Sequence, residues 1–162
     1  MIYLLYGQDS YRLERRIQEI KKSAEVENSG INYAEIVNDY DAAKIISEAN
    51  SLPFLGDKRV LVIRGLLASK DKTVLEKIND FLPNVSDQVE LVFVELTVPD
   101  QRLLLTKNLN KLAKVQNFNN LTPLEIIKYI ETTVSDKGGS IDRQTAMQLQ
   151  LYLGNDLLKI NN

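Results

Sequence analysis

Residues 51–64 constrain the fold of this chain more than any other stretch. They end in Val60-Leu61-Val62-Ile63, an unbroken aliphatic run that is typical of a strand buried on both faces of a sheet. Pro53 cannot continue a helix, so Leu52 and Phe54 on either side of it are predicted to lie on a short connector before this strand. Two interpretations of the pair stay open: both side chains belong to the core, or they form an exposed apolar plug for a partner protein.

Helices and strands are predicted to alternate through the first 118 residues. Strands are expected at 2–6, 31–37, 60–63, 89–94 and 115–118, and helices near 13–24, 42–49, 72–82 and after an opening at 97–100. Parallel neighbours need crossover connections, which helices supply. The predicted fold class is therefore α/β, with a parallel sheet covered by helices on both faces.

The character of the sequence changes near residue 119. Thr122 and Glu125 have the spacing of a capping box around Pro123, a residue favoured in the first turn of a helix. Only helices are predicted beyond this point, and the last of them starts at Asp156 and is unfinished where the sequence ends. We expect a domain at 1–118, a truncated helical domain at 119–162 and a fragment of a longer protein, because a half-built helical domain cannot close its own core.

Composition excludes several classes of function. The chain has no Cys and no His, which rules out disulfides and the catalytic or zinc sites built on those side chains. Its net charge of −2 argues against the chain as a whole binding a phosphate backbone. No apolar run approaches the roughly 20 residues of a membrane span, and the first residues lack an export signal, so a cytoplasmic protein is expected.

The first strand runs into a turn and a helix, an order that raises the hypothesis of a phosphate-binding loop. The turn holds Gly7 without the second glycine and the Lys-Ser/Thr pair of such a loop, and Asp9 brings a negative charge to the place of the phosphates. The third strand ends in Arg64 instead of the acidic pair that holds magnesium. Asp39 and Asp41 are predicted to start a helix and not to form a paired-acid site. The sequence therefore predicts no catalytic residue, no cofactor and no metal site.

Several segments together resemble the delta subunit family of bacterial DNA polymerase III. They are residues 2–13, 51–54 with 59–62, 99–102, 121–125 and 137–142. The resemblance implies a clamp-loader subunit for DNA replication, whose first domain is AAA+-like, a degenerate P-loop NTPase fold without a nucleotide site. It also implies that 119–162 is a truncated, all-helical lid domain and that a third, helical collar domain is absent from this sequence.

The resemblance further implies how such a subunit acts on its partner. Members of the family open the ring-shaped sliding clamp, the beta subunit, by inserting a Leu and a Phe from the first domain into a pocket on the clamp. Those positions correspond here to Leu52 and Phe54, with Asn50 or Leu55 as a third contact. Pro53 separates the pair, whereas other members can place the two side by side. The other implied partners are the gamma/tau and delta prime subunits of the loader, and DNA through the complex.

The subunit itself is expected to have no intrinsic catalysis, although its parent complex is a DNA-directed DNA polymerase, a nucleotidyltransferase. Two alternatives stay open beside this interpretation. One is a stand-alone cytoplasmic α/β protein-interaction domain, unrelated to replication, with Leu52 and Phe54 in its core. The other is a degenerate nucleotide-binding protein that hydrolyses ATP with unfamiliar residues.

Overall fold

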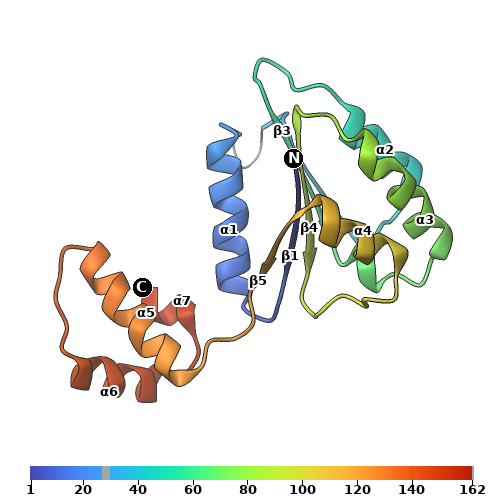
Figure 1. Ribbon diagram of the computed structural model, residues 1–162. Coiled ribbons are helices and arrows are strands. Elements are labelled where there is room, and N and C mark those ends of the chain that lie inside the picture. Colours follow the sequence, from blue (N-terminus) through green and yellow to red (C-terminus); the bar gives the residue numbers. More distant parts are fainter. Residues whose placement is uncertain (27–29, 162) are drawn as a thin grey trace. The chain divides into compact units, whose positions relative to one another are not determined.

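A computed structural model of the chain describes residues 1–26 and 30–161 (Figure 1). It divides into two compact units, Met1–Phe118 and Asn119–Asn162. The first unit contains a sheet with helices on both faces, and the second contains helices.

The first unit is built on a five-stranded parallel sheet with the order β2-β3-β4-β1-β5. Its strands are β1 (Ile2–Tyr6), β2 (Tyr33–Val37), β3 (Arg59–Arg64), β4 (Val89–Glu95) and β5 (Lys114–Asn117), and every pairing is parallel. The aliphatic run at 60–63 lies in β3, between β2 and β4. Leu61 and Ile63 pack into the core on one face of the sheet and Val60 and Val62 into the core on the other, so both faces of the run are covered. The predicted α/β fold with a parallel sheet is confirmed.

Helices cover both faces of this sheet. Helix α1 (Ser10–Ser23) packs on one face, and α2 (Ala42–Asn50), α3 (Lys72–Phe81) and α4 (Leu104–Leu112) pack on the other, as Figure 1 shows. Two short 3₁₀ turns, η1 (Leu66–Ala68) and η2 (Leu82–Asn84), follow β3 and α3. Successive residues of a strand point to opposite faces of the sheet. Leu4 packs into the core between the sheet and α2–α4, and Leu5 packs into the core between the sheet and α1.

Aspartates start three of these helices. The side chains of Asp9, Asp41 and Asp71 accept hydrogen bonds from backbone N–H groups in the first turns of α1, α2 and α3, which satisfies donors that have no partner inside a helix. Asp39 forms an exposed ion pair with Lys44 at 2.9 Å. The predicted helix start is confirmed with Asp41 as its cap, whereas Asp39 lies before α2.

The fourth helix begins later than predicted. Residues 97–100 were expected to open it, but α4 starts at Leu104. The carboxylate of Asp100 instead accepts a hydrogen bond from the backbone N–H of Arg102 at 2.9 Å. It also forms an ion pair with the Arg102 guanidinium at 2.7 Å, and the two contacts stabilise a separate turn. An aspartate side chain can accept a hydrogen bond from the backbone N–H two residues later in an isolated turn as well as at the start of a helix. The sequence pattern alone therefore does not distinguish a turn from a helix start here.

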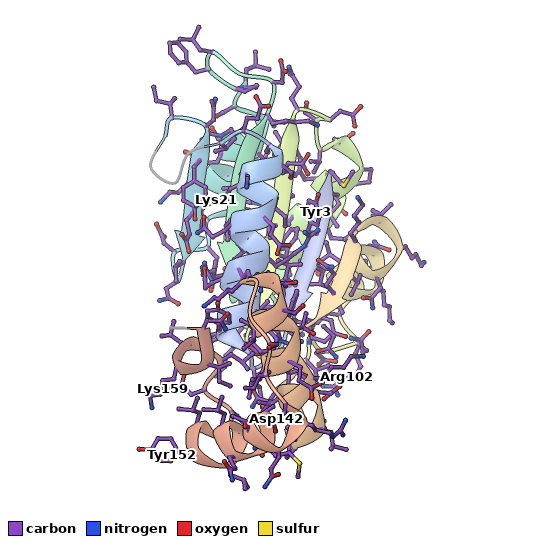
Figure 2. All side chains as sticks on the ribbon, turned by 90° about the vertical axis from the view of Figure 1, so that its left-hand side faces the viewer. Tyr3, Lys21, Arg102, Asp142, Tyr152 and Lys159 are labelled. Atoms are coloured by element: carbon purple, nitrogen blue, oxygen red, sulfur yellow. The ribbon has the colours of Figure 1, made fainter. Side chains whose placement is uncertain are left out.

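The second unit consists of α5 (Pro123–Asp136), α6 (Arg143–Leu153) and α7 (Leu157–Asn161). The predicted capping box is confirmed: the Thr122 N–H donates to the Glu125 carboxylate at 2.8 Å, and the Glu125 N–H donates to the Thr122 hydroxyl at 3.4 Å. Its core is small, formed by Ile126, Ile127, Ile130, Ala146 and Leu157. Several apolar side chains stay exposed, and Tyr152 points away from the ribbon (Figure 2).

Across residues 1–26 and 30–161, no helix combines the length and the apolar character that a membrane span requires.

Candidate functional site

Four apolar residues between α2 and β3 form an exposed segment at one end of the sheet. This plug segment, residues 52–55, follows the end of α2 and precedes the amino-terminal end of β3 (Figure 1). Leu52, Phe54 and Leu55 expose 74, 58 and 92 % of their surface. Large apolar side chains that gather at one exposed place mark an interaction surface more often than a single exposed Leu does.

Helix α2 ends directly before the plug segment. Asn50 is its last residue and is exposed, and Ser51 caps it, because the Ser51 N–H donates to the Glu48 carbonyl at 3.3 Å and its hydroxyl donates to the Ser47 carbonyl at 2.9 Å. Asn50 is therefore held at a fixed helix end beside Leu52. The four residues singled out as clamp contacts lie within six positions of each other on the surface.

The alternative that places Leu52 and Phe54 in the core is wrong. Phe93 shows the contrast within the same unit: it lies in β4, is 0 % exposed and belongs to the core between the sheet and α2–α4. Pro53 biases Leu52 toward an extended conformation, and α2 has already ended. The connection before β3 therefore does not pack its side chains into the core.

The turn after β1 presents a carboxylate where a phosphate-binding loop presents amides. Asp9 accepts the Arg12 N–H at 3.0 Å and forms an ion pair with the Arg12 guanidinium at 2.6 Å. The amino terminus of α1 is thus occupied by a charge of the same sign as a phosphate. This arrangement opposes nucleotide binding at the turn.

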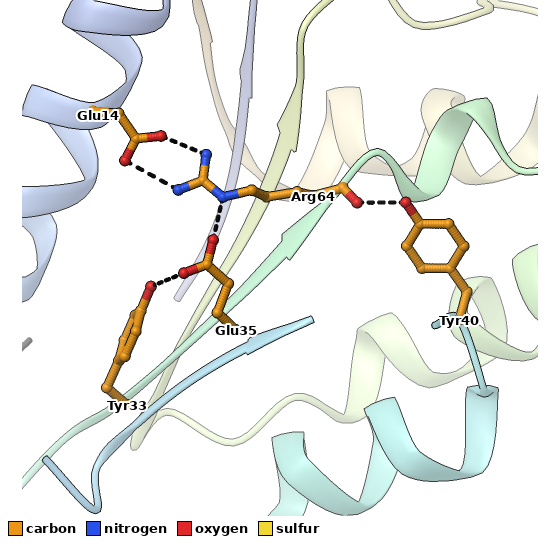
Figure 3. Close-up of polar contacts among 5 residues, drawn as sticks. All are labelled: Glu14, Tyr33, Glu35, Tyr40 and Arg64. Carbon is orange, nitrogen blue, oxygen red and sulfur yellow. Dashed lines mark hydrogen bonds and ion pairs between the residues drawn. The ribbon is translucent and has the colours of Figure 1, made fainter. Parts of the chain in front are cut away.

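Arg64, at the carboxyl end of β3, is held between two carboxylates (Figure 3). Its guanidinium forms a two-pronged pair with Glu14 on α1, at 2.6 and 3.0 Å, and its Nε donates to Glu35 on β2. Glu35 also accepts the Tyr33 hydroxyl at 2.6 Å. Burial by itself would raise the pKa of Glu35, but the hydrogen bonds from Tyr33 and Arg64 outweigh it and hold that pKa below its ordinary value.

This network joins α1, β2 and β3 through a fixed positive charge. A magnesium site needs carboxylates that are free to bind the ion, whereas both acids here already pair with the guanidinium. Among the residues that the structure describes, no cluster of three or more acidic side chains is placed to hold a metal ion. The network is suited to fixing the sheet edge, and we assign it no chemical step.

Glu95 is a buried acid that the sequence pattern did not single out. It ends β4, is 3 % exposed, and its Oε1 accepts the Leu67 N–H at 2.7 Å. It lines a mostly apolar cavity of about 380 Å³ with Val37, Tyr40, Gly65 and Leu96. Burial raises the pKa of Glu95 to about 7, and the single hydrogen bond from Leu67 opposes this only in part.

Glu95→Gln is expected to make the free energy of unfolding less dependent on pH, because the wild type loses stability as Glu95 ionises. An acid with a raised pKa stabilises the fold fully below its unfolded value near 4.5, and this contribution disappears as the pH rises through about 7. Gln keeps an oxygen for the Leu67 N–H and does not ionise. Between pH 5 and pH 8, the unfolding free energy of the wild type should fall by up to about 3 kcal/mol relative to the variant, measured by urea denaturation.

Glu76→Gln, a change of an exposed glutamate on α3, is the control for this measurement. Its pH profile should follow that of the wild type. Parallel profiles for the wild type and Glu95→Gln would show that Glu95 ionises normally in the folded chain.

The chain is similar in sequence to a known bacterial family. Residues 3–119 match the family model described as DNA polymerase III, delta subunit. The DNA polymerase III subunit delta of Bacillus subtilis (strain 168) is 23% identical over 171 residues, covering 98% of this chain and 49% of the relative. The chain thus spans about half the length of the curated relative it matches.

Two solved structures share the fold. The DNA clamp loader delta protein of Bacillus subtilis has a TM-score of 0.82 at 20% identity, over 99% of this chain and 50% of the other. A DNA polymerase III gamma-subunit-related protein from Thermotoga maritima has a TM-score of 0.60 at 13% identity, over 99% of this chain and 51% of the other. At these identities, the likenesses establish the fold alone.

Proposed function

Since the chain belongs to the family of DNA polymerase III delta subunits, we propose that it binds the sliding clamp through the plug segment and helps to open the ring during DNA replication. Leu52 and Phe54 are the anchors in this proposal, and Asn50 and Leu55 are contacts beside them. The observation that carries the proposal is the exposure of three large apolar side chains in one short segment. A few residues that fill desolvated pockets dominate the free energy of many protein interfaces.

In this proposal the chain acts by binding the clamp and catalyses no chemical step. A subunit that binds an opened or distorted clamp more tightly than the closed ring shifts the ring toward opening by the difference between the two affinities. The carboxylate of Asp9 and the paired guanidinium of Arg64 support the view that this chain does not hydrolyse nucleotide itself. In the proposed loader, ATP acts on other subunits.

We propose that the two units correspond to domains of a delta subunit. We assign Met1–Phe118 to the AAA+-like domain without a nucleotide site and Asn119–Asn162 to part of the lid domain. The relatives are about twice as long as this chain, and the collar domain is proposed to lie in the remainder of such a protein. The proposed partners are the clamp, the gamma/tau and delta prime subunits and, through the complex, DNA; the proposed place of action is the cytoplasm.

Photo-crosslinking tests where the clamp contacts the chain. With p-benzoylphenylalanine in place of Phe54, irradiation in the presence of the cognate clamp is expected to give a covalent product with the clamp, measured by gel electrophoresis and mass spectrometry. The matched control carries the same residue at Leu104, which is also exposed but starts α4, after the carboxyl end of β4 and at the opposite end of the sheet.

A product from position 104 but none from position 54 would contradict the proposed contact. Products from both positions in equal yield would indicate collisions without a defined interface.

A further inference from the structure

The side chain of Asn32 forms a pair of hydrogen bonds with the backbone of Phe54. Its Nδ2 donates to the Phe54 carbonyl oxygen at 2.8 Å, and the Phe54 N–H donates to its Oδ1 at 2.6 Å. The two residues lie 22 positions apart in the sequence, one just before β2 and the other in the connection before β3. One carboxamide thereby satisfies both backbone polar groups of the aromatic residue in the plug segment.

Asn32 is itself fixed to the sheet. Its carbonyl oxygen accepts the Val60 N–H at 2.8 Å, next to the register pair of Tyr33 and Val60 that begins the β2–β3 ladder. Gly56 gives the carboxamide room, because a Cβ at that position would lie 3.2 Å from the Asn32 Nδ2. The plug segment is therefore attached to a rigid point of the fold.

The plug segment has little else to hold its conformation. Within residues 1–26 and 30–161, the hydrogen bonds to residues 52–57 are the two made by Asn32. Leu55 has a φ of 50°, in the left-handed region that a leucine seldom adopts, so the surroundings must maintain it. Loss of the Asn32 contacts would release the segment to other conformations.

We propose that Asn32 is a positioning residue that holds the plug segment in the conformation presenting Leu52 and Phe54 to the sliding clamp. The inference rests on the function proposed above. A segment that is already held in its binding conformation loses less conformational entropy when it binds. Asn32 thus increases the affinity for the clamp by holding the backbone of Phe54 in place, whereas the side chains of Leu52 and Phe54 make the contact with the clamp.

Asn32→Ala tests this role in the complete chain. We expect clamp affinity to fall about tenfold, the value that one ordered, rotamer-rich group contributes, while the melting temperature stays within about 2 °C because both hydrogen bonds lie at the surface. The Phe54 amide should also lose its protection from hydrogen exchange. Affinity is measured by titration calorimetry, and exchange by nuclear magnetic resonance.

Two further variants sharpen the test. Asn32→Asp keeps the volume but replaces the amide donor by an oxygen that faces the Phe54 carbonyl, so it should lose as much affinity as Asn32→Ala. Asn110→Ala is the matched control, since the Asn110 amide donates at 2.8 Å to Gln101 in an equally exposed contact far along the chain from the plug segment. It should bind the clamp as the wild type does.

The outcomes separate this inference from the proposed function. Normal clamp binding by both Asn32 variants, together with weak binding by Leu52→Ala/Phe54→Ala, would overturn the positioning role and leave the function standing. Normal binding by Leu52→Ala/Phe54→Ala would overturn the function itself. A large fall in melting temperature for Asn32→Ala, with the Phe54 amide still protected in the folded fraction, would make Asn32 a residue of the general fold and would also overturn the inference.

Discussion

Replacing Leu52 and Phe54 together by Ala is expected to weaken binding to the cognate sliding clamp by about 100-fold or more, because two anchors of an interface are removed at once. The melting temperature should hardly change, since the two side chains expose 74 and 58 % of their surface and contribute little to the core. Titration calorimetry with the clamp and thermal unfolding by circular dichroism measure the two quantities on the same preparations.

The single variants add information on how the anchors act. Each of Leu52→Ala and Phe54→Ala should lose part of the affinity, and their effects need not add, because neighbouring contacts in one interface are coupled. A matched control is Leu104→Ala, which removes an exposed leucine from α4. If the double variant loses melting temperature and affinity together, the segment supports the fold and the interpretation as a plug is wrong.

Phe93→Ala is expected to have the opposite pattern. Phe93 is fully buried in β4, in register with Leu4 on β1 and Ile63 on β3. Removal of its ring leaves a cavity in a close-packed core and should cost about 3–5 kcal/mol of unfolding free energy, which corresponds to a fall in melting temperature of roughly 10 °C or more. The measurement is denaturant unfolding of the variant and the wild type.

The comparison of the two phenylalanines is informative because the same atoms are removed in both. Below its melting temperature, Phe93→Ala should bind the clamp with the affinity of the wild type, since its side chain lies far from the surface. Phe54→Ala should keep the stability and lose affinity. An unchanged unfolding free energy in Phe93→Ala would contradict the assignment of the core between the sheet and α2–α4.

The sequence pattern predicted the sheet well because the relevant signals are local. An aliphatic run such as 60–63 needs cover on both faces wherever it lies, and the periodicity of the helices is visible within each helix. The opening of α4 was predicted too early because Asp100 can cap a turn as readily as a helix. Local sequence chemistry predicts whether a segment is a helix or a strand better than it predicts the residue at which the helix or strand begins.

The candidate site could be predicted only in part. The position of Pro53 places Leu52 and Phe54 on a connector, but apolar residues beside a proline are compatible with either the core or the surface. Their exposure depends on where the neighbouring strand and helix end in space. The contact between Asn32 and Phe54 joins residues 22 positions apart, and nothing in the local sequence marks an asparagine that has such a partner.

The same reason explains the network around Arg64. Glu14, Glu35 and Arg64 come from a helix and two strands, and the sequence showed only that the end of β3 lacks an acidic pair. The raised pKa of Glu95 arises from burial against residues of three different segments. Properties that depend on tertiary contacts became visible only when the fold was known.

The central claim is that the exposed plug segment is a binding surface for the sliding clamp. The most direct test is a calorimetric titration of the cognate clamp with this chain alone, without other loader subunits, beside the Leu52→Ala/Phe54→Ala variant. The account predicts saturable binding by the wild type and little or none by the variant. The absence of binding by the folded wild-type chain, or equal binding by both proteins, would contradict it.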